Sequence, residues 1–85
     1  MDKHPVGKIT HYFSKIGVAV VEVSGKLAVG DRIVIEGSEG APVEQTVGSM
    51  QIEHQEVQEA SQGQSVGMKV AGKVHPGNVV FRVSD

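Results

Sequence analysis

The chain has 85 residues, with one tyrosine, two phenylalanines, no cysteine and a formal net charge of −2. The lack of cysteine excludes a disulfide framework and a thiolate metal site, and makes a cytoplasmic setting the default expectation. No run approaches the roughly 18 apolar residues of a membrane helix, so we expect no membrane contact. A dedicated nucleic-acid domain usually has a basic footprint, whereas segment 31–64 holds seven acidic residues and one basic residue.

The length matches a single domain over residues 1–85, and eleven glycines among many valines indicate short strands rather than helices. Alternating apolar residues predict six strands, at residues 6–13, 18–23, 31–36, 45–52, 65–70 and 78–83. The stretch "GKLAVGDRIVI" at 25–35 is a corner, in which Gly25 and Gly30 turn the chain into the third strand. Alternation places these side chains in the core: Ile9, Val21, Ile33, Ile35, Met68 and Phe81.

The first two strands form a predicted hairpin with a candidate contact surface on its outer side. Because Glu22 must face water, alternation puts Val18 and Val20 on the outer face as well. In the first strand, the same argument turns Phe13 inward. The outer face then joins basic, aromatic and apolar groups, with the turn residue added: Lys8, Thr10, Tyr12, Lys15, Val18 and Val20. Such a mixture suits either a protein partner or single-stranded RNA.

No local motif for catalysis or cofactor binding is present. The order GxxxxGK[ST] of a phosphate-binding loop does not occur, so we expect neither nucleotide binding nor GTP hydrolysis. The four histidines have no HxH or HExxH spacing, which argues against a metal site. The "GQS" at 63–65 is not a nucleophile elbow, and the carboxylates Glu53, Glu56 and Glu59 resemble a solvated strip. We therefore expect a protein that is not an enzyme and has no cofactor.

The order of the signals along the chain resembles the second domain of the translational GTPases such as elongation factor Tu. The resemblance covers nearly the whole chain, from "VGKITHYFSKIGVAVVEV" (6–23) through "GKLAVGDRIVIEG" (25–37) and "QTVGSMQIEHQEVQEASQGQSVGMKVAG" (45–72) to "PGNVVFRV" (76–83). It implies an all-β fold, a small closed six-stranded β-barrel of the translation-factor second-domain type. The chain looks closest to small translation elongation factor-like proteins, and Glu59 takes the place of a family acidic residue near the site of the terminal adenosine of tRNA.

This resemblance predicts a non-enzymatic module that binds RNA, either tRNA or ribosome-associated, or a translation or RNA-modification protein. The alternative is a protein-interaction or structural barrel without nucleic-acid contact, such as an accessory domain of a collagenase-like peptidase. We expect a monomer or weak oligomer. The candidate binding residues are Lys8, Tyr12, Lys15, Val18, Val20 and Glu59.

Overall fold

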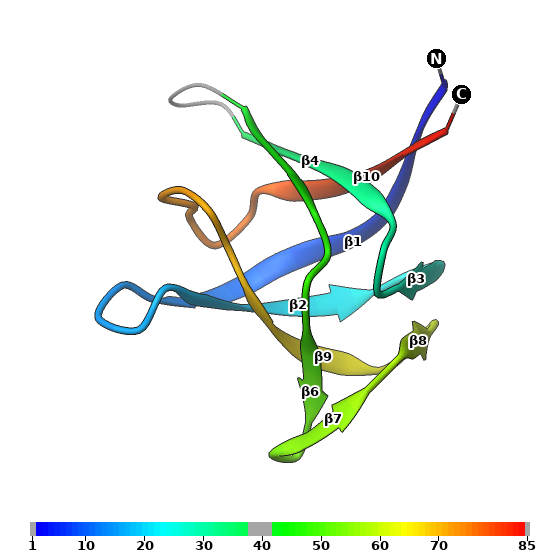
Figure 1. The fold of residues 1–85 in the computed structure, drawn as a ribbon. Helices are drawn as coiled ribbons and strands as arrows, with labels where there is room; N and C mark the ends of the chain where they lie inside the picture. The colour runs from blue at the N-terminus through cyan, green and yellow to red at the C-terminus, as the bar shows by residue number, and fades with distance from the viewer. Residues whose placement is uncertain (1, 38–41, 85) are drawn as a thin grey trace.

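The computed structural model describes residues 2–37 and 42–84, and this part of the chain is built from strands without a helix. Figure 1 shows these strands wrapped around one interior. They are β1 (Asp2–Phe13), β2 (Val18–Val23), β3 (Lys26–Ala28), β4 (Arg32–Glu36), β5 (Val43–Thr46), β6 (Met50–Ile52), β7 (Gln55–Val57), β8 (Glu59–Ser61), β9 (Ser65–Lys69) and β10 (Val79–Ser84). The all-β prediction is confirmed, and four of the six predicted strands are found with similar bounds. The predicted strand 45–52 is divided into β5 and β6.

The larger sheet is an open half-barrel with the strand order β5-β4-β10-β1-β2-β9-β6-β7, and β3 pairs with β8 in a second, two-stranded sheet. The prediction of a closed six-stranded barrel is therefore wrong. Strand β5 pairs with β4 up to Thr46, and the chain pairs with β9 only from Met50, at the start of β6. Among the described residues, therefore, no ladder pairs β5 with β9. Residues 47–49 form a full break between these two strands.

A side chain spans the place where the ladder is missing. The amide of Gln45 on β5 donates from Nε2 to the Lys69 carbonyl at 2.8 Å, and its Oε1 accepts from the Ala71 N–H at 2.6 Å. One side-chain amide can supply both a donor and an acceptor, as a strand residue would. Gln45 thus ties the end strand β5 to the C-terminal end of β9.

The corner at 28–31 sets the direction of β4. The Asp31 carboxylate accepts a hydrogen bond from the Ala28 N–H at 2.9 Å, while Gly30 takes a φ of 97° that side chains rarely adopt. Val47 then bonds the corner twice, accepting from the Gly30 N–H at 2.9 Å and donating to the Asp31 carbonyl at 2.8 Å. These bonds hold the break between β5 and β6 against the start of β4.

The interior is filled by aliphatic and thioether side chains from both sheets. Five of the six predicted core residues are confirmed, each at most 2% exposed: Ile9, Val21, Ile33, Ile35 and Met68. Burial of each such side chain stabilises the fold by roughly 1.5–3 kcal/mol. Leu27 and Ala60 bring the β3–β8 pair onto the same core.

The prediction of which side chains face inward at the end of β1 is wrong. The register between β1 and β2 shifts between Ile9 and His11, so Thr10 is the extra residue of a β-bulge. Beyond the bulge, Tyr12 pairs with the fully buried Ala19 and packs against the core, whereas Phe13 is 45% exposed. One extra residue reverses which side chains point inward, and this places Tyr12 inside and Phe13 outside.

Phe81 is the predicted core residue that lies elsewhere. On β10 it is Val80 that is fully buried, while Phe81 pairs with Pro5 and Val34 on the opposite face and is only half-buried. The Lys3 ammonium lies 4.6 Å from the Phe81 ring centre and covers it. Because side chains alternate along β10, the burial of Val80 turns its neighbour Phe81 to the other face of the sheet.

Candidate binding groove

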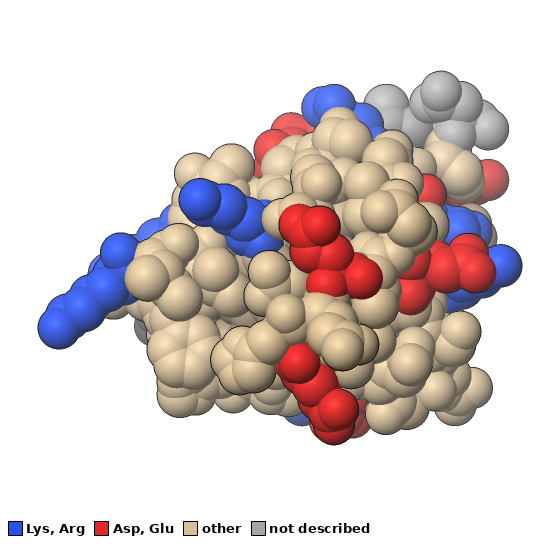
Figure 2. Space-filling view, turned by 60° about the horizontal axis from the view of Figure 1, so that its bottom comes forward, with Lys and Arg blue, Asp and Glu red and all other residues tan. Residues whose placement is uncertain are grey.

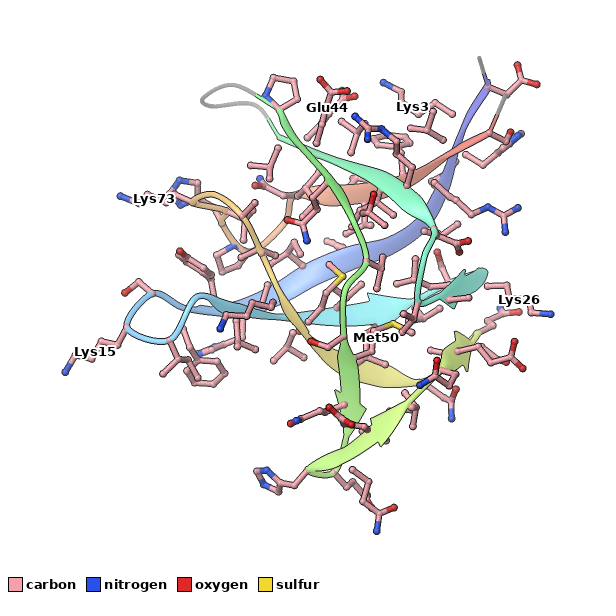
Figure 3. The ribbon with its side chains drawn as sticks, in the orientation of Figure 1. Lys3, Lys15, Lys26, Glu44, Met50 and Lys73 are labelled. Atoms are coloured by element: carbon pink, nitrogen blue, oxygen red, sulfur yellow. The ribbon has the colours of Figure 1, made fainter. Side chains whose placement is uncertain are left out.

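The structure does not gather the predicted binding residues into one site. Lys8, Val18 and Val20 share the outer face of the hairpin, because Lys8 pairs with Glu22 and alternation carries that face along β2. Tyr12 faces the interior, and Lys15 points outward from the tip of the β1–β2 turn (Figure 3). Glu59 lies in the other sheet, on β8, where it pairs with Ala28.

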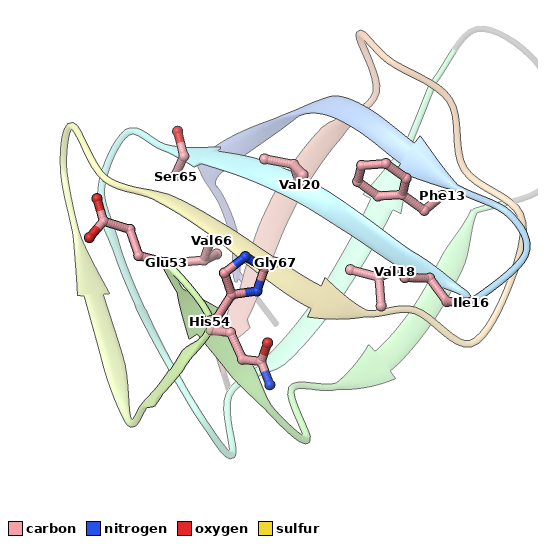
Figure 4. Close-up of a pocket in the computed structure, with 10 residues that line it drawn as sticks. Phe13, Ile16, Val18, Val20, Glu53, His54, Ser65, Val66 and Gly67 are labelled. Carbon is pink, nitrogen blue, oxygen red and sulfur yellow. The ribbon is translucent and has the colours of Figure 1, made fainter.

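A groove of about 450 Å³ lies on the outer face of β2 and β9, between the β1–β2 turn and the β6–β7 turn. Figure 4 shows Glu53 and Ser65 toward one end of it and Phe13 and Ile16 toward the other. Volumes of this size are typical of small-ligand or side-chain sites. The lining residues are Phe13, Ile16, Val18, Val20, Gln51, Glu53, His54, Ser65, Val66 and Gly67.

The floor of the groove follows the pairing of β2 with β9. Val20 pairs with Gly67, which pairs in turn with Gln51 on β6, so these three residues form one row across the outer face. A Cβ on Gly67 would lie 3.6 Å from a methyl group of Val18, within the space above the strands. The glycine therefore leaves a hollow that the half-buried Val18 and Val20 border with apolar surface.

One wall of the groove is apolar and exposed. Phe13 is 45% exposed and Ile16 is 62% exposed, and they are the large hydrophobic residues that stand exposed within the described ranges 2–37 and 42–84. Their turn is well defined, because the Phe13 carbonyl accepts from the N–H groups of Ile16 at 3.2 Å and Gly17 at 2.9 Å. The His11 ring lies 4.3 Å from the Phe13 ring and supports it from the side.

The opposite wall is the two-residue turn Glu53-His54, which joins β6 to β7 directly beyond the pair Ile52 and Gln55. Both residues are left-handed, with φ of 51° and 66°. A two-residue hairpin loop with two positive φ values is a type I′ turn, for which Asn-Gly is the preferred pair. Glu-His is an unfavourable choice for this backbone, and the turn holds both side chains at the groove.

The groove contains a carboxylate, an imidazole and a hydroxyl, from Glu53, His54 and Ser65. No hydrogen bond joins these three side chains in the part of the chain that the structure describes. The described residues also hold no group of three or more His, Cys, Asp or Glu side chains able to bind a metal ion. Within the same residues, no helix has the length and apolar character to cross a membrane.

Several lining residues were missed by the sequence analysis, namely Ile16, Gln51, His54 and Gly67. Ile16 carried a usable signal, because a large apolar residue inside a predicted turn has no core to enter. The others could not be found in this way, since their position depends on how β6 and β9 pair.

Comparison with protein families places the chain. Residues 18–80 match the family model of elongation factor Tu domain 2. The chain belongs to the elongation factor Tu domain 2 family. The curated relatives described next are named as a protease and a collagenase.

An uncharacterized protease of Methanocaldococcus jannaschii is 35% identical over 98% of this chain, and a collagenase of Porphyromonas gingivalis is 41% identical over 91% of it. The chain spans only about a fifth of the length of these relatives, 20% and 22% respectively.

Two crystal structures share the fold. Both show the C-terminal domain of a protein assigned as a U32 peptidase from Geobacillus thermoleovorans. The first has a TM-score of 0.90 at 23% identity and covers 95% of this chain and 93% of that one; the second, a selenomethionine variant, has 0.87 at 24% and covers 91% and 96%.

These findings correct the functional prediction. The resemblance to the second domain of elongation factor Tu is real at the level of the domain family, but the predicted translational and RNA-binding role is wrong, because the relatives are proteases and collagenases. The alternative, an accessory domain of a collagenase-like peptidase, agrees better with the comparisons. Membership of the domain family therefore indicates function less closely than the identity of the proteins that contain the related segments.

Proposed function

We propose that this chain acts as a non-catalytic accessory domain of a collagenase-like U32 peptidase. The observation that carries the proposal is the pattern of coverage: nearly the whole chain matches, yet it matches only about a fifth of each protease. The same fold occurs as a separately crystallised C-terminal domain of a U32 peptidase. Four-fifths of the relatives' length remain for the peptidase machinery.

The site geometry supports a binding role for the accessory domain. Its groove has one apolar wall and a floor built on paired strands, which gives a rigid concave surface. The groove's Ser65 hydroxyl and His54 imidazole are not hydrogen-bonded to each other within residues 2–37 and 42–84, whereas a serine nucleophile is commonly activated by such a contact. A rigid binding surface next to a catalytic domain would raise the local concentration of substrate.

Two assays test this proposal. The purified 85-residue chain should hydrolyse neither gelatin nor collagen above a mock preparation. In the P. gingivalis collagenase, deletion of the segment that matches this chain should raise KM for collagen while cleavage of a short peptide changes little, because only the long substrate reaches both parts. Hydrolysis by the isolated chain, or an unchanged KM for collagen after the deletion, would overturn the proposal.

A further inference from the structure

The two ends of the groove differ in chemical character. At one end, Ser65 pairs with the exposed Glu22, and Glu53 stands beside it on the β6–β7 turn. At the other end lie the exposed Phe13 and Ile16. Figure 4 shows this separation, and Figure 2, which brings the β6–β7 end of the molecule forward, shows acidic side chains down the middle of that face.

The spacing along the floor is that of an extended chain. The outward residues of β9 are Ser65, Gly67 and Lys69, which pair with Glu22, Val20 and Val18 on β2. From the first to the last of these positions is about 13 Å at roughly 3.3 Å per residue. An extended peptide lying over the floor would turn every second side chain toward it, so it would place three side chains over these three rows.

We propose that the groove binds an extended peptide segment, supplied by another polypeptide, that has a basic residue followed at alternate positions by two apolar residues. The basic side chain would pair with Glu53, one apolar side chain would occupy the hollow over Gly67, and the second would pack on Phe13 and Ile16. The choice of a peptide as ligand rests on the proposed function, since the relatives are proteases.

The charges and the turn support this ligand class. Carboxylates at one end repel phosphate groups, which disfavours nucleic acid and anionic lipid there. The backbone of Glu53 and His54 is held in a conformation that few side chains adopt, and such strain is found where side chains are positioned for function. In the described residues the structure shows no ion pair to Glu53, so its carboxylate is available to a ligand.

The test is an NMR titration of the isotope-labelled 85-residue chain with the peptide acetyl-Gly-Arg-Ser-Val-Ser-Leu-Gly-amide. We expect saturable shifts at Val18, Val20 and Gly67 with a Kd of about 0.1–1 mM, as suits a small open groove. A peptide with Asp in place of Arg should bind more weakly, and one with Ser in place of Val and Leu should not bind. This measurement needs no peptidase activity, so its failure is separate from failure of the proposed function.

Matched variants locate the site. Phe13→Ser should weaken binding by roughly tenfold, because it removes an aromatic anchor. Glu53→Gln should weaken it roughly threefold for the Arg peptide only, whereas Glu44→Gln, an exposed glutamate on β5 far from the β6–β7 turn (Figure 3), should change nothing. Unchanged thermal unfolding of each variant verifies the fold.

Three results would overturn the inference: no saturable shift, shifts centred on β4 and β10, or equal binding of the Asp and Arg peptides. Binding of an RNA oligonucleotide at Val20 and Gly67 with a steep salt dependence would also overturn it.

Discussion

Replacement of Glu53-His54 by Asn-Gly should make the protein more stable. Both residues are left-handed, with φ of 51° and 66°, and that conformation costs a residue with a side chain roughly 1–2 kcal/mol. Asn tolerates it and Gly adopts it freely, although the Gly also gives the unfolded chain about 0.5–1 kcal/mol of extra entropy. No hydrogen bond from either side chain is lost among the described residues. The expected net gain is about 1–2 kcal/mol.

Urea and thermal unfolding followed by far-UV circular dichroism measure this gain. For a domain of this size, each kcal/mol corresponds to a rise in Tm of roughly 4–8 °C. Glu44→Asn, in the extended strand β5, is the control and should not raise Tm, because no left-handed backbone is relieved there. If Asn-Gly leaves Tm unchanged or lowers it, the turn is not strained and the argument from its backbone to a functional role of the groove fails.

Two further changes test how the sheet is held together. Gly7→Ala should destabilise the protein by about 1–3 kcal/mol in urea unfolding, because the new Cβ would lie 2.6 Å from a Val21 methyl carbon and 3.0 Å from the Glu22 carbonyl oxygen. A loss of stability under about 0.5 kcal/mol would show that β1 and β2 can separate easily. Gln45→Leu should lower the free energy of unfolding by about 1–2 kcal/mol, since it removes the two hydrogen bonds to Lys69 and Ala71. Hydrogen exchange of the Ala71 amide should then become faster, and unchanged exchange would refute the bridging role of Gln45.

Much of the fold could be predicted because its core strands alternate regularly. The strand 18–23 was predicted with its observed bounds, and Ile33 and Ile35 were correctly placed inside, since one-face burial fixes the phase wherever pairing is regular. The prediction failed beyond the bulge at Thr10. The extra residue is defined by how β1 pairs with β2, and nothing in the local pattern of "ITHYF" reveals it.

The openness of the sheet and the candidate groove were harder to predict. Three-residue strands such as β6, β7 and β8 are too short for a periodic signal, and the pairings of β6 with β9 and of β8 with β3 join residues that are remote in the sequence. Alternation did identify Val18 and Val20 as outward-facing, and they border the groove. Glu53 and His54 could not be placed there, because a Glu-His pair is not a recognised signal for a type I′ turn.

The accessory role is tested most directly by a domain exchange. In the P. gingivalis collagenase, the segment that is 41% identical to this chain is replaced by the 85-residue chain itself. The kcat/KM of this chimera for collagen is then compared with those of the parent enzyme and of the deletion variant. The account predicts that the chimera regains most of the kcat/KM that the deletion loses, and that Phe13→Ser in the chimera lowers it again. A chimera no better than the deletion variant, with the fold of the inserted segment intact, would contradict it.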